Sequence, residues 1–382
     1  MAGRRSVVGL VCAAGVLLSS ATGFALAASQ DGSASAAFQP WASSFVSAST
    51  GFVLGGVGCR FGVNGAQRPC KPVVVTTSDS GGIWHRLSAP PALLQWLVTP
   101  AGGADVRAIT FADSHDGWLY GPGLWATHDG GAHWTRTAVK GLVMSVVTGG
   151  GWAYAAVVGP RSAGAASVLR SPVGRDDWKP VSSPAGSIAS GDGGWLLAAS
   201  GGSLWAGTLP VPNSTSAPEL WRSAYGAPWQ RLRNPCGSGS LASLTASSAS
   251  DLVMLCGGRA LRIAASSDGG AHTQRVPAPA TSVFGPLAAP LNTRTTIVFA
   301  YPPRLALSAS VPPPPSPSWL DRTADGGGSW TRSPYSDHGV GRADLQFSSP
   351  GVGWVIHGYP GASVDQLMQT TDAGATFKPV RF

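Results

Sequence analysis

The stretch THDGGAHW, Thr127 to Trp134, decides the fold, because versions of it return along the chain. TSDSGGIW (Thr77–Trp84) and TADGGGSW (Thr323–Trp330) share its pattern of Thr, any residue, Asp, any residue, Gly, two residues and Trp. Two further copies change the last position: SSDGGAHT, which also begins with Ser266, ends in Thr273, and TTDAGATF ends in Phe377. The pattern is therefore a repeat unit of the whole chain, and a single catalytic loop would not return in this way.

Two eroded copies complete the series. SPVGRDDW ends in Trp178 with Val173 at the Asp position, and RSAYGAPW ends in Trp229 with Ala224 there. The last positions of all copies are 84, 134, 178, 229, 273, 330 and 377, and successive positions differ by 50, 44, 51, 44, 57 and 47 residues. Repeats of this length are typical of propeller blades.

A second signature precedes the box. FVSASTGFVLG, FADSHDGWLYG and FSSPGVGWVIHG begin at Phe45, Phe111 and Phe347, and each has Gly six residues after Phe and then an aromatic residue. In the second unit VRAITF, GWLYG, LWATH and HWTRTAV read as four short strands separated by Gly, Asp and Ser turns. No window after the N-terminal segment has helical periodicity.

With both signatures, the chain resembles the Asp-box (bacterial neuraminidase repeat) proteins, and most closely the photosystem II assembly-factor propellers. The family also includes sialidases, sortilin-type receptors and xyloglucan-hydrolysing propellers. The resemblance implies an all-β fold, a seven-bladed β-propeller of four-stranded antiparallel blades spanning residues 38–382. It does not imply one function, because enzymes, receptors and scaffolds share the repeat.

The resemblance also implies a structural role for the box residues, as a hairpin turn between the third and fourth strands of a blade. Asp129 would accept hydrogen bonds from turn N–H groups, Gly131 would supply a positive φ, and Trp134 would pack into the sheet interior. The complete set with these roles is Asp79, Gly81, Trp84, Asp129, Gly131, Trp134, Asp268, Gly270, Asp325, Gly327, Trp330, Asp372, Gly374 and Phe377. In family members the boxes lie on the face opposite the ligand.

The N-terminus has the layout of a secretory signal peptide. Arg4 and Arg5 precede an apolar run, and Ala25-Leu26-Ala27 supplies a small-residue cleavage site, so we expect a signal peptide over 1–27 and a flexible Ser/Ala/Gly linker over 28–37. An uncleaved anchor is the alternative, and the Sec and Tat routes both stay open. We expect an extracellular or cell-surface protein, a monomer with no stable membrane insertion after cleavage.

Export favours disulfides. Removal of the signal peptide takes Cys12 and leaves Cys59, Cys70, Cys236 and Cys256, which allow three connectivities. The pairing local in sequence is Cys59 with Cys70 and Cys236 with Cys256. No pair has CxxC spacing and no histidine is close by, so we expect no metal and no cofactor.

The charge balance is basic, with a net charge of +8 at pH 7. Every unit has a cation one or two positions after the box: Arg86, Arg136, Lys179, Arg231, Arg275, Arg332 and Lys378. The fourth strand is the outer edge of a blade, where charge prevents edge-to-edge association. We therefore expect no nucleic-acid partner.

An enzymatic function finds little support. The chain has one glutamate, Glu219, and lacks the F/Y-R-I-P motif, so we do not expect a sialidase. A glycoside hydrolase with an aspartate pair is the alternative, with Asp105, Asp344 and Asp365 as its candidates.

The favoured function is a non-enzymatic binding or assembly scaffold that meets an envelope protein or glycan on the face opposite the boxes. The chain departs from its own repeat at VGCRFGVNGAQRPCK, LSAPPALLQWLVTPAGGAD, SGGSLWAGTLPVPNSTSAPE and YPPRLALSASVPPPPSPSW. Long loops on a rigid scaffold commonly carry recognition. The candidate binding residues in these segments are Arg60, Trp96, Trp205, Tyr301, Arg304 and Trp319.

Overall fold

The computed structural model describes residues 38–59, 70–94, 103–159, 166–181, 195–208, 218–224, 227–237, 239–257, 260–279, 287–290, 294–300, 318–335, 344–357 and 366–382. Within these ranges every regular element is a β-strand, and there is no helix long and apolar enough to cross a bilayer. The predicted signal peptide and linker fall outside the described residues and stay predictions.

The strands form four-stranded antiparallel sheets in which neighbours along the chain pair with one another. Blades 1 to 3 are β1 (Phe38–Phe45), β2 (Gly51–Val57), β3 (Pro72–Thr77) and β4 (His85–Arg86); β5 (Ala108–Phe111), β6 (Gly117–Tyr120), β7 (Leu124–Thr127) and β8 (Thr135–Arg136); β9 (Leu142–Gly149), β10 (Trp152–Val158), β11 (Ala166–Pro172) and β12 (Lys179–Pro180). Each sheet is thus a simple meander.

The remaining sheets repeat this plan. Blades 4 and 5 are β13 (Trp195–Ser200), β14 (Ser203–Thr208), β15 (Leu220–Ala224) and β16 (Gln230–Leu232); β17 (Ser240–Ala246), β18 (Leu252–Gly257), β19 (Arg262–Ser266) and β20 (Gln274–Val276). Blades 6 and 7 are β21 (Leu287–Pro290), β22 (Thr296–Ala300), β23 (Ser318–Thr323) and β24 (Thr331–Tyr335); β25 (Asp344–Phe347), β26 (Gly353–His357), β27 (Gln366–Thr370) and β28 (Lys378–Pro379).

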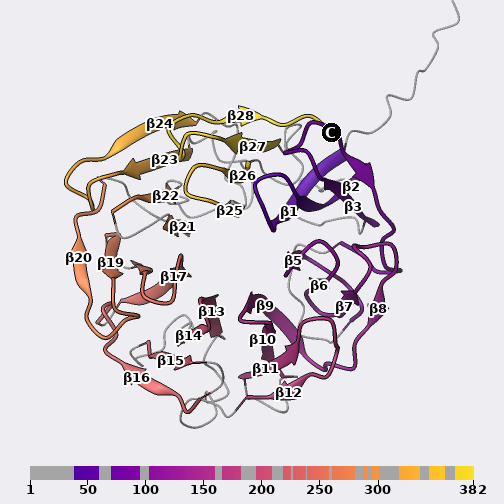
Figure 1. The fold of residues 1–382 in the computed structure, drawn as a ribbon, viewed down its shortest axis with the longest axis horizontal. Coiled ribbons are helices and arrows are strands. Elements are labelled where there is room, and N and C mark those ends of the chain that lie inside the picture. Colours follow the sequence, from indigo (N-terminus) through magenta and orange to yellow (C-terminus); the bar gives the residue numbers. More distant parts are fainter. Residues whose placement is uncertain are drawn as a thin grey trace, which may run out of the picture. The chain divides into compact units, whose positions relative to one another are not determined.

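The first strands of the sheets line the centre of a ring, and the fourth strands lie on its circumference (Figure 1). β1, β5, β9, β13, β17, β21 and β25 contact one another in succession, and β25 returns to β1. The prediction of an all-β propeller with four-stranded antiparallel blades is confirmed, and the described strands make seven such sheets. The outer strands are shorter than expected: β8 comprises Thr135–Arg136 and pairs only with Trp125 and Ala126.

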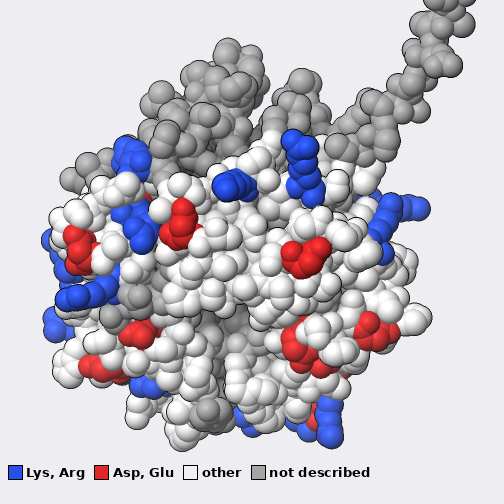
Figure 2. All heavy atoms as spheres, turned by 45° about the horizontal axis from the view of Figure 1, so that its top comes forward, with Lys and Arg blue, Asp and Glu red and all other residues white. Residues whose placement is uncertain are grey.

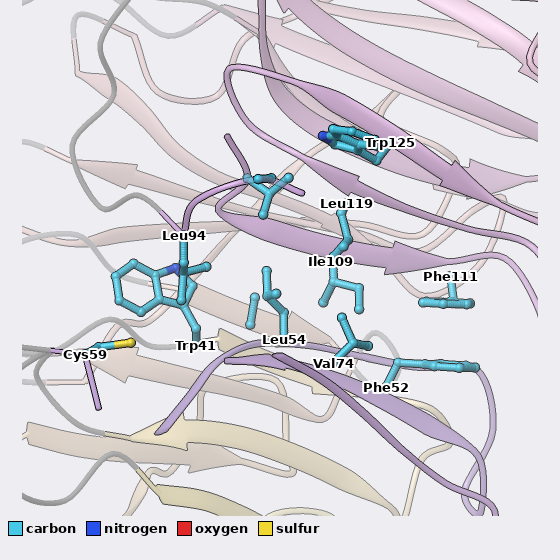
Figure 3. Close-up of a cluster of buried hydrophobic side chains, with 13 residues drawn as sticks. Trp41, Phe52, Leu54, Cys59, Val74, Leu94, Ile109, Phe111, Leu119 and Trp125 are labelled. Carbon is cyan, nitrogen blue, oxygen red and sulfur yellow. The ribbon is translucent and has the colours of Figure 1, made fainter. Parts of the chain in front are cut away.

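The hydrophobic core lies between neighbouring sheets. Phe52, Leu54 and Val74 of blade 1 pack against Ile109 and Leu119 of blade 2 (Figure 3). Comparable clusters join the other successive blades, and one of them joins blade 7 to blade 1. Each blade is therefore stabilised chiefly by its two neighbours, and closure of the ring buries the last pair of sheet faces.

The Phe…Gly signature explains part of this packing. The Phe111 ring covers Gly117, where an added Cβ would lie 2.5 Å from the ring, so no larger residue fits. The aromatic residue after each such glycine reaches the next blade. Phe52 stacks on Phe111 with ring centroids 3.5 Å apart, and Trp354 stacks on Phe45 at the same distance. The second signature thus encodes contacts both within a blade and between blades.

Candidate functional site

The box turns repeat one hydrogen-bond pattern. In blade 2 the Thr127 hydroxyl donates to Asp129 Oδ1 at 2.8 Å and accepts from the Gly131 N–H at 2.8 Å, while Asp129 Oδ1 accepts from the His133 N–H at 2.9 Å. The same three bonds recur in the boxes of Asp79, Asp268, Asp325 and Asp372. The backbone N–H and imidazole of His133, then the Thr127 hydroxyl, lower the pKa of Asp129. The carboxylate therefore stabilises the turn.

The turn backbone requires the glycines. Gly130 and Gly131 have φ of +70° and +89°, a backbone conformation that residues with a side chain rarely adopt. The N–H of Gly130 also donates to the His115 carbonyl at 2.9 Å, which ties the box turn to the turn between the first two strands of its blade. Both turns lie at one end of each meander, and we call that side of the ring the box face.

The box tryptophans lie between blades. The resemblance predicts that Trp134 packs into the sheet interior. The ring packs against the core cluster of blades 1 and 2, and its indole N–H donates to the Ser88 carbonyl of the preceding connection at 3.1 Å. Trp330 makes the equivalent bond to the Pro277 carbonyl at 2.9 Å. Trp84 of blade 1 contacts Phe382, with ring centroids 4.9 Å apart, near the end of blade 7. These residues seal the boundary with the preceding sheet.

In the eroded boxes the serine hydroxyl donates to the carbonyl of the residue four positions on, whereas Thr127 accepts from the N–H of the residue at that position, Gly131. Ser171 Oγ donates to the Arg175 carbonyl at 2.5 Å, and Ser223 Oγ donates to the Ala227 carbonyl at 2.6 Å. Trp221 pairs with Arg231 as Trp125 pairs with Arg136, so Ser223 is the counterpart of Thr127. The sequence alignment that placed Ala224 at the Asp position of blade 4 is therefore wrong by one residue.

The other side of the ring, which we call the opposite face, carries the connections from β2 to β3 and from blade to blade. Both predicted disulfides are present there: Cys59–Cys70 closes the β2–β3 connection, and Cys236–Cys256 ties the entry of blade 5 to its second strand. Between blades 1 and 2, Leu94 forms bridges to Cys70 and Val106. Among the described connections of this face, those of blades 1 and 5 are thus held by different local contacts.

A polar cluster, here called the axial cluster, lies where inner strands begin on the opposite face. It consists of Arg107, Tyr120 and Asp344, from blades 2 and 7. Arg107 donates to the Met144 carbonyl of blade 3 at 2.9 Å, and its burial lowers its pKa. Burial also raises the pKa of Tyr120, on which Arg107 and Asp344 act in opposite directions. Sequence reasoning missed both residues: Arg107 lies in no motif or insertion, and Tyr120 lies in the Phe…Gly signature at a position to which no role was assigned.

Asp344 closes the ring. Its Oδ2 accepts from the Ser43 N–H at 2.6 Å and from the Ser43 hydroxyl at 2.9 Å, and Gln346 Oε1 accepts from the Phe45 N–H at 3.1 Å. Side chains of β25 thus bind backbone groups of β1. Among the described strands, the first and last blades do not share a sheet, so these bonds join the two ends of the ring. This position gives Asp344 a structural role that a hydrolase carboxylate does not need.

The other sequence-predicted residues are dispersed. Asp105 accepts from the Leu93 N–H at 3.2 Å within the connection between blades 1 and 2. Trp205 is not a surface binding residue: it is 0% exposed on β14, and its indole donates to the Gly269 carbonyl at 2.9 Å. Trp319 lies on β23, paired with Ala300 and Pro334. The remaining candidates lie outside the described residues: Arg60, Trp96, Tyr301, Arg304 and Asp365.

Charge is distributed unevenly between the faces. Most described acidic residues lie in turns of the box face: Asp79, Asp113, Asp116, Asp129, Asp176, Asp177, Asp251, Asp268, Asp325 and Asp372. The others each bind a group of the fold: Asp105, Glu219, Asp321 and Asp344. Exposed Lys71 and Lys140 lie on the opposite face. In Figure 2 basic side chains lie along the upper border of the described surface and also at its left and lower borders, with acidic side chains between them.

The cations after the boxes all lie where the sequence places them. Each belongs to an outer strand and is exposed: Arg86, Arg136, Lys179, Arg231, Arg275, Arg332 and Lys378. Arg332 forms two bonds to buried Asp321, at 2.8 and 3.2 Å, and Arg231 binds Glu219 at 2.7 Å. This spacing around the circumference fits edge protection and does not form one compact basic patch.

No protein-family model and no curated protein sequence matches the chain. Among solved structures, YCF48 bound to a D1 peptide has a TM-score of 0.52 and 19% identity, covering 88% of this chain and 94% of that one. YCF48 from Cyanidioschyzon merolae gives 0.52 and 15%, over 88% and 96%. What the chain shares with these proteins is the β-propeller fold.

An enzyme shares the fold as well. A catalytically inactive variant of virginiamycin B lyase from Staphylococcus aureus, solved with quinupristin, has a TM-score of 0.55 at 11% identity, covering 87% of this chain and 95% of that one. The fold by itself therefore does not separate a binding protein from an enzyme, and the functional argument depends on this chain's own faces.

Proposed function

We propose that the chain is an exported, non-enzymatic scaffold that binds an extended segment of an envelope protein on the opposite face. The observation that carries the proposal is the contrast in construction between the faces. Box residues such as Thr127 and Asp129 bind one another, and they do so in the same way in five blades. The opposite face instead breaks the repeat with disulfides and the axial cluster.

The chemistry of the partner follows from the charges. Asp105, Glu219 and Asp344 are used within the fold, whereas Lys71 and Lys140 are exposed. This surface favours a partner segment with acidic side chains, because complementary charge increases both association rate and specificity. The D1 peptide bound by the structural neighbour YCF48 supports a peptide over a glycan. A seven-bladed Asp-box scaffold of the assembly-factor type fits this function.

Matched charge reversals test the proposal. The purified chain is applied in parallel to an array of peptides from exported proteins and to a glycan array. We expect acidic peptides to bind, and Lys140→Glu to weaken binding by on the order of tenfold. Arg175→Glu, a charge reversal at an exposed residue of the box face, is the control and should leave the dissociation constant unchanged. Binding to glycans alone, or equal losses in both variants, would overturn the proposal.

A further inference from the structure

His128 bridges two blades through both nitrogens of its ring. Nδ1 lies 2.6 Å from Asp116 Oδ1, in the first turn of its own blade 2, and Nε2 lies 3.2 Å from Asp176 Oδ2, in the box turn of blade 3. The side chains of Asp116 and Asp176 are 17% and 26% exposed, and that of His128 is 40% exposed. The sequence gives no reason to separate His128 from His133, whose side chain is 88% exposed.

The geometry fixes the protonation state. An ionised carboxylate only accepts hydrogen bonds, and a neutral imidazole has one N–H, so both contacts form together only with the imidazolium. Partial burial acts to lower the pKa of His128, but the bonds and charges of Asp116 and Asp176 outweigh it and raise the pKa above 6.5. Loss of the proton leaves one carboxylate facing a ring lone pair.

The neighbouring charged groups are engaged with other partners. In the turn of Asp116, Asp113 accepts the N–H groups of His115 and Asp116 at 2.8 Å. Beside His128, Asp129 binds His133 Nδ1 at 2.6 Å. In the turn of Asp176, Asp177 binds Lys179 at 2.6 Å, and exposed Arg175 is the remaining cation. His128 is therefore the titrating group that joins the two turns.

Three other blade boundaries on the box face are joined by arginine or glutamine side chains, not by histidine. Arg222 of blade 4 donates to the Ala249 carbonyl of blade 5, and Arg322 of blade 6 donates to the Ala373 carbonyl of blade 7. Gln369 of blade 7 donates to the Ser80 carbonyl of blade 1. We expect a change between pH 5 and 9 to leave all three contacts intact, because none of them involves a histidine or a carboxylate.

We propose that His128 is a proton-dependent clamp between blades 2 and 3, which holds Asp176 when protonated and releases it when deprotonated. The sign is fixed by linkage: a histidine whose folded pKa is raised stabilises the fold fully below pH 6.5 and loses this contribution as the pH rises through the folded pKa. Acid therefore tightens the boundary between blades 2 and 3, and alkali loosens it, while the other boundaries stay unchanged.

Nuclear magnetic resonance of the full chain from pH 5 to 9 tests the clamp. We expect both ring nitrogens of His128 to be protonated at the acid end, with a midpoint above 6.5. Asp176→Asn should shift that midpoint downward, because it removes one carboxylate. His133→Asn is the control, since His133 binds a carboxylate only within its own turn, and it should leave the His128 midpoint unchanged.

Hydrogen exchange gives an independent readout at the boundary. After correction for intrinsic exchange, the amide of Arg175, which donates to the Pro172 carbonyl, should be better protected at pH 5.5 than at pH 8.5. His128→Asn and Asp176→Asn should abolish this difference, and His133→Asn should retain it. A His128 midpoint at or below 6.5, or a pH difference that survives Asp176→Asn, would overturn the proposal.

Discussion

The two faces of the ring are built from different contacts. On the box face, five turns repeat the bonds of Thr127, Asp129 and Gly131, and neighbouring blades are joined by single side chains such as Arg322. On the opposite face, the described connections of blades 1, 2 and 5 are held by two disulfides and by the bridges of Leu94, which do not repeat one another. Repetition indicates what any blade needs to fold. The parts that break the repeat are where we expect the residues of a function specific to this chain.

The largest expected effect concerns the disulfides. Replacing both Cys236 and Cys256 by Ala opens a link of sequence separation 20, and chain entropy predicts a loss of about 3.3 kcal/mol in the free energy of unfolding. The matched pair Cys59→Ala and Cys70→Ala, of separation 11, should cost about 2.8 kcal/mol. Denaturant unfolding measures both. A negligible loss in either variant would show that covalent links do not hold the opposite face.

Thr127→Val tests the box face. It removes the hydroxyl from a buried side chain and leaves the buried Gly131 N–H without its acceptor, which should cost about 1–3 kcal/mol. Thr135→Val, on the exposed outer strand β8, is the control and should stay within about 0.5 kcal/mol of the original chain. Partner binding should persist in both. A stable Thr127→Val variant that no longer bound its partner would reverse the roles of the two faces.

The smallest effect is the acid dependence of one box. The Thr376 hydroxyl, more than any other group, lowers the pKa of Asp372 from 3.8 to about 2. A carboxylate with a lowered pKa stabilises the fold above its unfolded value and loses this contribution as the pH falls from 3.8 toward 2. Unfolding curves between pH 5 and 2 should therefore be flatter for Asp372→Asn than for the original chain. Parallel curves would show that the ionised carboxylate of Asp372 does not contribute to the stability of the turn.

Much of the fold could be predicted because the box and the Phe…Gly signature mark turns and contacts that backbone sterics require. The role of Ser223 in the eroded box of blade 4 could not be predicted. A one-residue deletion shifts this box along the sequence, and only the pairing of the strands shows the shift. Trp205 was wrongly expected on the surface, because the segment interpreted as an insertion in blade 4 contains the strand β14, Ser203–Thr208. The grouping of Arg107 and Tyr120 with Asp344 was not predicted, because these residues come together only when the blades close into a ring, and no local sequence pattern indicates this.

Hydrogen–deuterium exchange with a bound acidic peptide reports on both faces in one experiment and so shows which face binds. We expect protection on the opposite face, at Cys70–Lys71, around Arg107 and at Lys140, with no change in the box turns around Asp129 and Asp325. Protection confined to the box turns, with the opposite face unchanged, would contradict it.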